Sequence, residues 1–204
     1  MLPFHPPAGT SVHDYVTRLV PEAHRAQVPE DASPQEWTVS IRVPGTVNAH
    51  YRIRGNALEM REEEDKAHLA VVLDDAHVSH FLADFQGPRR YVPTFEPRGA
   101  RVITDPRVLE RLALVIGSLE AVVEDAEGGP VRLLVAAFGG KPGRFDEDDD
   151  RDVTLTLRAS AFEGLLKGTL APDALLSSGD VAVKGKRLVA MQFALALAPF
   201  FPLP

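Results

Sequence analysis

The fold is decided by residues 152–200, which read DVTLTLRASAFEGLLKGTLAPDALLSSGDVAVKGKRLVAMQFALALAPF. Val153, Leu155 and Leu157 alternate with polar residues, which is the two-residue period of a strand with one buried face. An apolar helix follows and ends near a glycine and a proline. A second short strand at 180–185 and a strongly apolar segment close the stretch. It therefore predicts strand, helix, turn, strand and helix, in that order.

Four segments of this stretch, DVTLTL, LLKGTLAP, SSGDVAVKG and AMQFALAL, resemble the sterol carrier protein type 2 (SCP2-like) superfamily. The resemblance includes the positions of Gly168, Pro172, Gly179 and Gly185 between the elements. It implies an α+β fold in which a mixed or antiparallel sheet is covered by helices. It also implies an apolar tunnel that holds a lipid.

The first half of the chain carries the same order of elements at a nearly fixed offset. Leu73 and Leu157 lie 84 positions apart, and the same offset aligns the acidic runs at 62–65 and 146–149. Agreement of pattern rather than of identity carries this comparison. We therefore predict a degenerate tandem repeat of two sterol-carrier-like halves.

The predicted halves are residues 1–119 and 120–204, with a helix over 106–123 that both halves share. Asp84 stands where the second half has Gly168, so the N-terminal half departs further from the family pattern. We expect that half to act as a scaffold and the C-terminal half to carry the ligand.

The remaining elements follow from periodicity and from glycine and proline. A helix is predicted over 12–26, with Ser11 as its N-cap and a break or restart at Pro21. An antiparallel meander of the strands 37–43, 47–54 and 57–61 is predicted next. The predicted strands are 37–43, 47–54, 57–61, 100–104 and 131–138, the last buried on both faces, and a further helix is predicted over 75–85.

Composition sets limits on function. The chain has 204 residues, of which 45% are hydrophobic and 25% are charged, as in ordinary globular proteins. It has no cysteine, which excludes thiolate nucleophiles and cysteine-based metal sites. Its net charge is -7, and its local basic patches are Arg89-Arg90 and residues 184–187, so we expect no nucleic acid partner.

Two features bear on location. Residues 1–10 lack a basic region followed by an apolar one, because three prolines interrupt them, so a secretory signal is not expected. No apolar run approaches about 18 residues, so we predict no membrane span. The expected location is the cytoplasm.

The sharpest indication of an enzyme is His77, His80 and Asp84, whose helical spacing lets two imidazoles and a carboxylate meet at one metal ion. These residues flank an apolar set on the helical wheel, so a solvated polar face is the favoured interpretation. Residues 146–150 alternate carboxylates as a calcium loop does, but the loop glycine is missing and Leu157 stands at the twelfth position. We predict neither metal site.

Other catalytic motifs are missing as well. Ser160, Ser177 and Ser178 have no G-x-S-x-G context and no histidine after them, which argues against a serine hydrolase. The glycine pairs match neither nucleotide-binding pattern. We predict no cofactor and no enzymatic activity.

The resemblance implies non-enzymatic binding or carriage of a hydrophobic small molecule: a lipid, a fatty acyl group or a sterol-like compound. Two interpretations of the terminal apolar segment stay open. It covers an apolar tunnel, or it fills the tunnel and leaves a protein-interaction or dimerisation module with a sterol-carrier-like fold. The predicted partners are the small molecule and, through the resemblance, a lipid-metabolising enzyme or a second copy. The predicted ligand-binding residues are Leu155, Phe162, Leu166, Leu188, Met191, Phe193 and Leu195.

Overall fold

The computed structural model describes residues 6–7, 9–27, 35–55, 57–61, 66–74, 106–126, 129–167 and 169–198. The strands are β1 (Glu36–Val43), β2 (Val47–Arg54), β3 (Ala57–Arg61), β4 (Leu69–Leu73), β5 (Ile116–Val123), β6 (Val131–Phe138), β7 (Val153–Leu157) and β8 (Val181–Gly185). The helices are α1 (Val12–Asp14), the π-helical η1 (Tyr15–Leu19), α2 (Val20–Gln27), α5 (Pro106–Leu112), α6 (Ala159–Lys167), α7 (Pro172–Ser178) and α8 (Arg187–Leu197).

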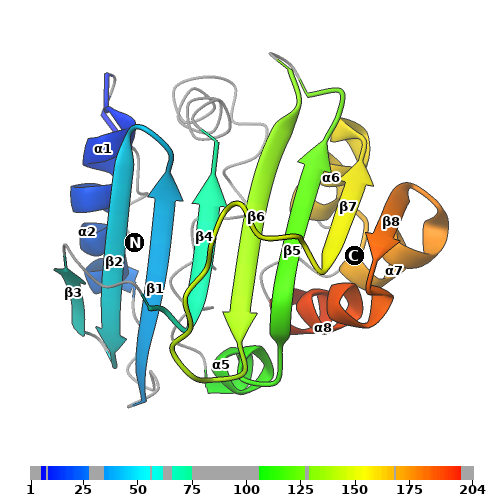
Figure 1. Ribbon diagram of the computed structural model, residues 1–204. Helices are drawn as coiled ribbons and strands as arrows, with labels where there is room; N and C mark the ends of the chain where they lie inside the picture. The colour runs from blue at the N-terminus through cyan, green and yellow to red at the C-terminus, as the bar shows by residue number, and fades with distance from the viewer. Residues whose placement is uncertain are drawn as a thin grey trace.

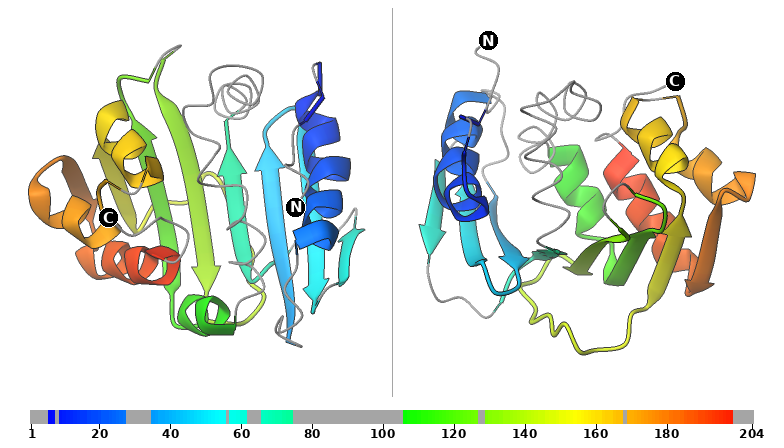
Figure 2. Two further views of the ribbon diagram at one scale, coloured as in Figure 1. Left: turned by 180° about the vertical axis from the view of Figure 1, so that it is seen from behind. Right: turned by 90° about the horizontal axis from the view of Figure 1, so that it is seen from above.

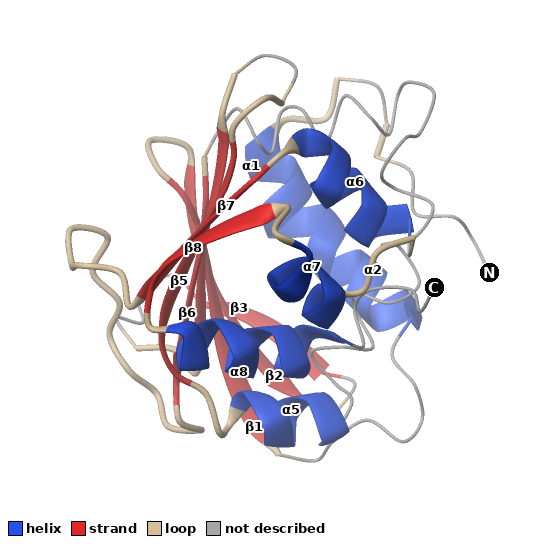
Figure 3. Cartoon of the chain, turned by 90° about the vertical axis from the view of Figure 1, so that its right-hand side faces the viewer, coloured by secondary structure: helices blue, strands red, loops and turns tan. Residues whose placement is uncertain are grey.

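Over these residues the strands form one mixed sheet in the order β3-β2-β1-β4-β6-β5-β7-β8 (Figure 1). The helices cover one face of the sheet, and Figure 2 shows that the connection from β6 to β7 crosses the other face. Seen from the side, sheet and helices form two layers (Figure 3). This arrangement confirms the predicted α+β fold class. The meander of β1, β2 and β3 and the terminal order of elements are also confirmed, with α7 where a turn was predicted.

The N-terminal helix begins as predicted but does not break at Pro21. The side chain of Ser11 caps it by accepting a hydrogen bond from the amide of Asp14 at 3.0 Å. Proline has no amide hydrogen, and the helix adapts through η1 just before it, where the amide of Val20 donates to the carbonyl of Tyr15. The carbonyl oxygen of Val16 accepts instead from the hydroxyl of Tyr51, at 2.5 Å. This bond ties the helix to β2.

The predicted helix over 106–123 is wrong beyond Leu112. The chain turns there and continues as β5, which pairs with β6 on one side and with β7 on the other. Gly117 has a φ of 144°, which no helix accommodates. The predicted boundary between residues 119 and 120 therefore lies inside a strand, and the division into two halves stays a prediction. The predicted helix over 75–85 and strand over 100–104 lie outside the described residues.

One large apolar cluster lies between the sheet and the helices. Its buried side chains come from η1, α5 and α8 and from the helix-facing positions of the strands, and they include Trp37, Tyr51, Leu112, Val153 and Phe193. On the other sheet face, Phe145 of the loop over residues 139–152 packs on a smaller cluster from β4 and β6. Both faces of the central strands are thus covered, as predicted for β6.

Candidate hydrophobic-ligand site

A second apolar cluster lies beneath α6 and α7, at the end of the sheet formed by β7 and β8. Its buried members combine these two helices with the inner faces of four strands. Both helices bury the apolar side of a short amphipathic segment, which is what holds them on the sheet. The buried members are Val123, Val131, Leu157, Ala161, Leu165, Leu175 and Val181.

The two apolar clusters meet at a pair of residues that is incompletely buried. Leu155 and Val183 face each other across β7 and β8, and both pack against both clusters. Their neighbours on the same sheet face, Val153, Leu157 and Val181, are buried, whereas Leu155 and Val183 keep part of their apolar surface exposed. We call this place the Leu155–Val183 seam. Both residues are apolar, face the helix-covered layer and are only partly buried.

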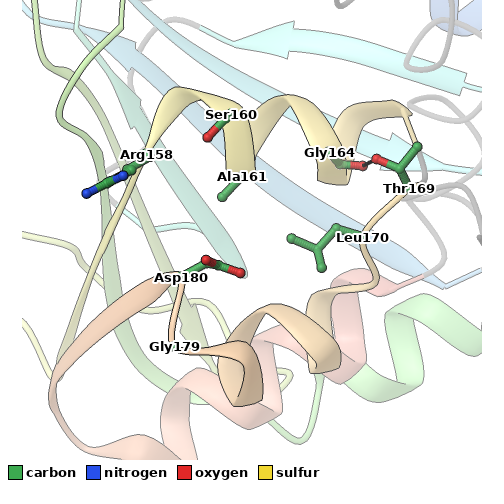
Figure 4. A pocket seen from close by; sticks show the side chains of 8 residues that line it. All are labelled: Arg158, Ser160, Ala161, Gly164, Thr169, Leu170, Gly179 and Asp180. Atoms are coloured by element: carbon green, nitrogen blue, oxygen red, sulfur yellow. Dashed lines mark hydrogen bonds between the residues drawn. The ribbon is translucent and has the colours of Figure 1, made fainter.

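A pocket of about 510 Å³ opens beside the second cluster, between α6 and the turn from α7 to β8. This volume lies in the range of ordinary small-molecule sites, about 300–1,000 Å³. Figure 4 shows Ala161, Leu170 and Asp180 pointing into the pocket and Arg158 pointing away. The pocket is lined by Arg158, Ser160, Ala161, Gly164, Thr169, Leu170, Gly179 and Asp180.

Local hydrogen bonds fix the pocket walls. The hydroxyl of Thr169 donates to the carbonyl of Gly164 at 3.2 Å and closes the end of α6 (Figure 4). At the start of α6, the amide of Ala159 donates to the carboxylate of Asp125 at 2.6 Å. That helix terminus already has an anionic partner within the chain. Besides the apolar side chains of Ala161 and Leu170, the pocket lining includes the polar side chains of Ser160, Thr169 and Asp180.

The structure distributes the predicted ligand-binding residues over three environments. Leu155 lies at the seam and Phe162 packs, partly buried, against the second cluster. Phe193 is fully buried in the large cluster. The side chain of Leu166 lies outside the described residues. Leu188, Met191 and Leu195 lie together on the outer face of α8 and are exposed.

Three further apolar residues belong to this region although the sequence did not single them out as ligand contacts. Val183 and Leu176 bridge the two clusters, and Leu170 packs against the second one. The alternation in β8 was the available signal for Val183. Leu170 lies in the connection between α6 and α7, and Leu176 lies within α7, which is too short for its periodicity to indicate a buried side.

An ionic anchor holds the start of β7 against β5 and α8. The carboxylate of Asp152 accepts from the amide of Ser118 at 2.9 Å and from the Lys186 ammonium at 2.6 Å. The amide of Asp152 in turn donates to the hydroxyl of Ser118 at 3.1 Å. The hydrogen bond from Lys186, followed by that from the Ser118 amide, holds the pKa of Asp152 below its usual value. This anchor fixes where α8 begins.

The candidate metal ligands give no site in the described part of the chain. His77, His80 and Asp84 lie outside it. Among the described residues, no group of three or more histidine or acidic side chains is arranged to hold a metal ion. In the acidic loop, Asp146 accepts from the amide of Asp148 at 3.0 Å, and Arg151 donates to the carbonyl of Asp146 at 3.2 Å.

The helices that the structure describes are all too short or too polar to cross a bilayer. The longest helix on the C-terminal side, α8, runs over Arg187–Leu197.

Solved structures with a similar course of chain include several sterol carrier proteins. Apo sterol carrier protein 2 of Yarrowia lipolytica is 19% identical, with 50% of this chain and 84% of that chain covered and a TM-score of 0.36. Palmitated SCP2L2 of Aedes aegypti is 21% identical, with coverages of 52% and 94% and a TM-score of 0.36. The ubiquinone synthesis protein UbiJ-SCP2 is 19% identical, with coverages of 53% and 96% and a TM-score of 0.35.

The comparison of sequences is more direct. No curated protein matches the chain. Residues 100–198, in contrast, match the model of the SCP-2 sterol transfer family. This segment contains α5, β5, β6, the anchor at Asp152, the seam and the pocket. Residues 100–198 are therefore similar to the SCP-2 sterol transfer family, which confirms the resemblance seen in the sequence.

Proposed function

We propose that the chain binds a hydrophobic small molecule in its C-terminal half and carries it without changing it chemically. The ligand class is a lipid, a fatty acyl chain or a sterol-like compound, and the compartment is the cytoplasm. The match of residues 100–198 to the model of a sterol transfer family supports the ligand class. The observation that carries the proposal is the Leu155–Val183 seam, where two apolar residues on the helix-covered face are only partly buried while their neighbours Val153, Leu157 and Val181 are buried.

In this proposal, an apolar chain enters through the pocket between α6 and the turn from α7 to β8. It passes Ala161 and Leu170 and lies along the seam, in contact with Leu155 and Phe162. Each Å² of apolar surface removed from water contributes roughly 25 cal/mol, so an acyl chain that covers the seam gains several kcal/mol. The polar rim at Ser160, Thr169 and Asp180 leaves the headgroup of the ligand in water.

The test is organic extraction of the purified protein followed by untargeted lipid mass spectrometry. Ala161→Phe places a ring where Ala161 points into the pocket and reduces the recovered lipid about tenfold or more. The matched control is Ala174→Phe, the same change at an exposed residue of α7 outside the pocket lining. Thermal melting of both variants verifies that they fold. A second variant, Leu170→Gln, keeps the pocket open and weakens apolar contact.

Two results would overturn the proposal. One is a protein that yields no lipid and whose melting temperature does not rise with added fatty acid, acyl-CoA or sterol. The other is lipid retained equally by Ala161→Phe and Ala174→Phe. The first result favours the interaction or dimerisation module with a filled interior.

A further inference from the structure

Helix α8 presents apolar side chains on two opposite sides. Its inner side, Val189, Ala190, Phe193 and Ala196, is buried in the large cluster. Its outer side exposes Leu188, Met191 and Leu195, whose exposed fractions are 68%, 54% and 59%. A helix on the surface of a globular protein ordinarily carries polar residues on that side. A row of three large exposed apolar side chains is typical of a surface that contacts another phase or molecule.

The outer side of α8 is also basic. Arg187 is exposed in the first turn and lies four residues before Met191, which places both on the same side of the helix. At the other end, the Arg111 guanidinium reaches from α5 to the carbonyl of Leu195, at 3.3 Å, and stays exposed. Residues 184–198 contain three basic side chains and no acidic one, in a chain of net charge -7.

Two neighbouring groups limit this positive charge. The ammonium of Lys186 lies 2.6 Å from the carboxylate of Asp152, which neutralises much of its charge. Glu110 is an exposed carboxylate on α5, the helix beside α8. Arg187 and Arg111 therefore supply the cationic character of the outer side, one near each end of the exposed apolar row.

We infer that the outer face of α8, formed by Arg187, Leu188, Met191 and Leu195, docks the protein on an anionic lipid bilayer. Leucine and methionine side chains enter the boundary between headgroups and acyl chains, while the arginines meet lipid phosphates. A helix of this length is about 16 Å long and lies in the plane of the surface. The choice of a bilayer as the partner rests on the proposed lipid-binding function.

Vesicle flotation tests this inference. The probes are vesicles of phosphatidylcholine with about one third phosphatidylglycerol, and vesicles of pure phosphatidylcholine. The wild-type chain floats with the anionic vesicles, and its partitioning to the neutral vesicles is lower by about fivefold or more. Leu188→Gln with Leu195→Gln reduces partitioning to the anionic vesicles by about tenfold or more. Arg187→Gln reduces it by about fivefold and weakens its dependence on salt.

The matched control is Met60→Gln against Met191→Gln, because Met60 is a methionine on β3 with an exposed fraction of 40%. Met191→Gln lowers flotation and Met60→Gln leaves it unchanged. The inference is overturned if the wild-type chain does not float, or if the α8 variants float as well as the wild type. It is also overturned if sedimentation velocity shows a dimer that Leu188→Gln with Leu195→Gln dissociates, since a second copy would then cover this face.

Lipid extraction separates failure of this inference from failure of the proposed function. A protein that contains lipid but does not float contradicts docking through α8 alone. A protein that floats through α8 but contains no lipid contradicts the carrier function alone.

Discussion

The strand triplets β2-β1-β4 and β6-β5-β7 are built on one plan. In each triplet the middle strand pairs antiparallel with the strand that follows it in the chain and parallel with the third. The registers agree as well, because Val39 lies opposite Leu69 in the first triplet and Leu119 lies opposite Val153 in the second. The offset of 84 residues noted in the sequence relates Leu69 to Val153. The tandem-repeat origin itself stays a prediction.

The triplets also share a hydrogen-bond motif at the start of their parallel pair, built from different side chains. In the first, the amide of Thr38 donates to Nδ1 of His68 at 3.0 Å, and the amide of His68 donates to the Thr38 hydroxyl at 3.2 Å. In the second, Ser118 and Asp152 exchange the same two bonds. The side chains of His68 and Asp152 thus accept from the amides of Thr38 and Ser118, while the amide of His68 also donates to the carbonyl of Thr38, at 2.9 Å. A neutral imidazole and a carboxylate thus serve one backbone requirement.

The triplets differ most at the first helix-facing position of the middle strand. Trp37 fills this position in β1, and its ring packs against that of His68 with the centroids 4.9 Å apart and the planes tilted by 44°. Gly117 holds it in β5, where a Cβ atom would lie 2.8 Å from the Asp152 carboxylate and 3.1 Å from Val189. The Trp37 ring occupies this position in the first triplet. In the second triplet, helix α8 packs close to the sheet at this position. The absence of a side chain in β5 is what lets α8 approach the sheet with its outer face free.

The largest expected effect comes from removing the ring. Trp37→Ala leaves a cavity in the large cluster and lowers the free energy of unfolding by about 4 kcal/mol. Urea denaturation followed by far-ultraviolet circular dichroism measures the loss. Trp37→Phe keeps most of the volume and lowers it by about 1–2 kcal/mol. A loss under about 1 kcal/mol in Trp37→Ala would show that the first triplet does not depend on this side chain.

The next effect concerns β8, which pairs with the second triplet. Gly185 has a φ of 102°, and a Cβ atom there would lie 2.3 Å from the carbonyl oxygen of Asp152. Because that neighbour is backbone, Gly185→Ala lowers the free energy of unfolding by about 3 kcal/mol. Gly179→Ala is the control, since Gly179 has a φ of 84° with open space around it, and its loss is about 1 kcal/mol. Equal losses in urea denaturation would contradict the contact with Asp152.

A smaller loss of stability is expected from changing Asp152, which accepts from both the Ser118 amide and Lys186. Asp152→Ala leaves the buried amide of Ser118 without its acceptor and lowers the free energy of unfolding by about 2 kcal/mol. Asp152→Asn keeps an oxygen there and loses only the ion pair with Lys186, for about 1 kcal/mol. Lys186→Met removes the same ion pair from its exposed side. If Asp152→Asn were as destabilising as Asp152→Ala, the ion pair rather than the amide would be the important contact.

These differences explain which parts of the fold the sequence predicts. Burial of one sheet face imposes alternation, so β1, β2, β3 and β7 were predictable from their own residues. The segment 106–123 was not, because Leu109, Leu112 and Leu119 also fit a helical period. What decides between helix and strand in its second half is pairing with β6 and β7, which lie elsewhere in the chain. The local periodicity of a segment does not show which strands it will pair with.

The candidate site shows the same division. Leu155 and Phe162 were predictable as inward-facing residues of a strand and an amphipathic helix. The side of α8 that faces the sheet was not, because Phe193 and Met191 stand in a helix that is apolar all round. Gly117 decides the outcome from a distant strand by making room for Val189. Only the packed structure separates core side chains of α8 from exposed ones.

The two triplets are expected to lose stability at different pH values. Burial lowers the pKa of His68 from its usual 6.5, and burial lowers the pKa of His24 to about 4. The unfolded chain therefore takes up these protons first, so stability falls as the pH drops below about 6.5. Asp152 behaves differently, because its pKa is lowered from 3.8, and its contribution is lost only as the pH falls through that lower value.

Trp37 reports on this difference, because it is the chain's single tryptophan and its ring packs against that of His68. On lowering the pH from 7, the emission of Trp37 changes at a pH below the usual imidazole pKa of 6.5, before circular dichroism shows loss of the sheet. His68→Gln keeps a hydrogen-bond acceptor for the Thr38 amide without a proton to gain, and it shifts the fluorescence change to lower pH. If the fluorescence and circular dichroism changes of the wild-type chain coincided, the two triplets would unfold together in acid. Protonation of His68 would then not destabilise the first triplet before the second.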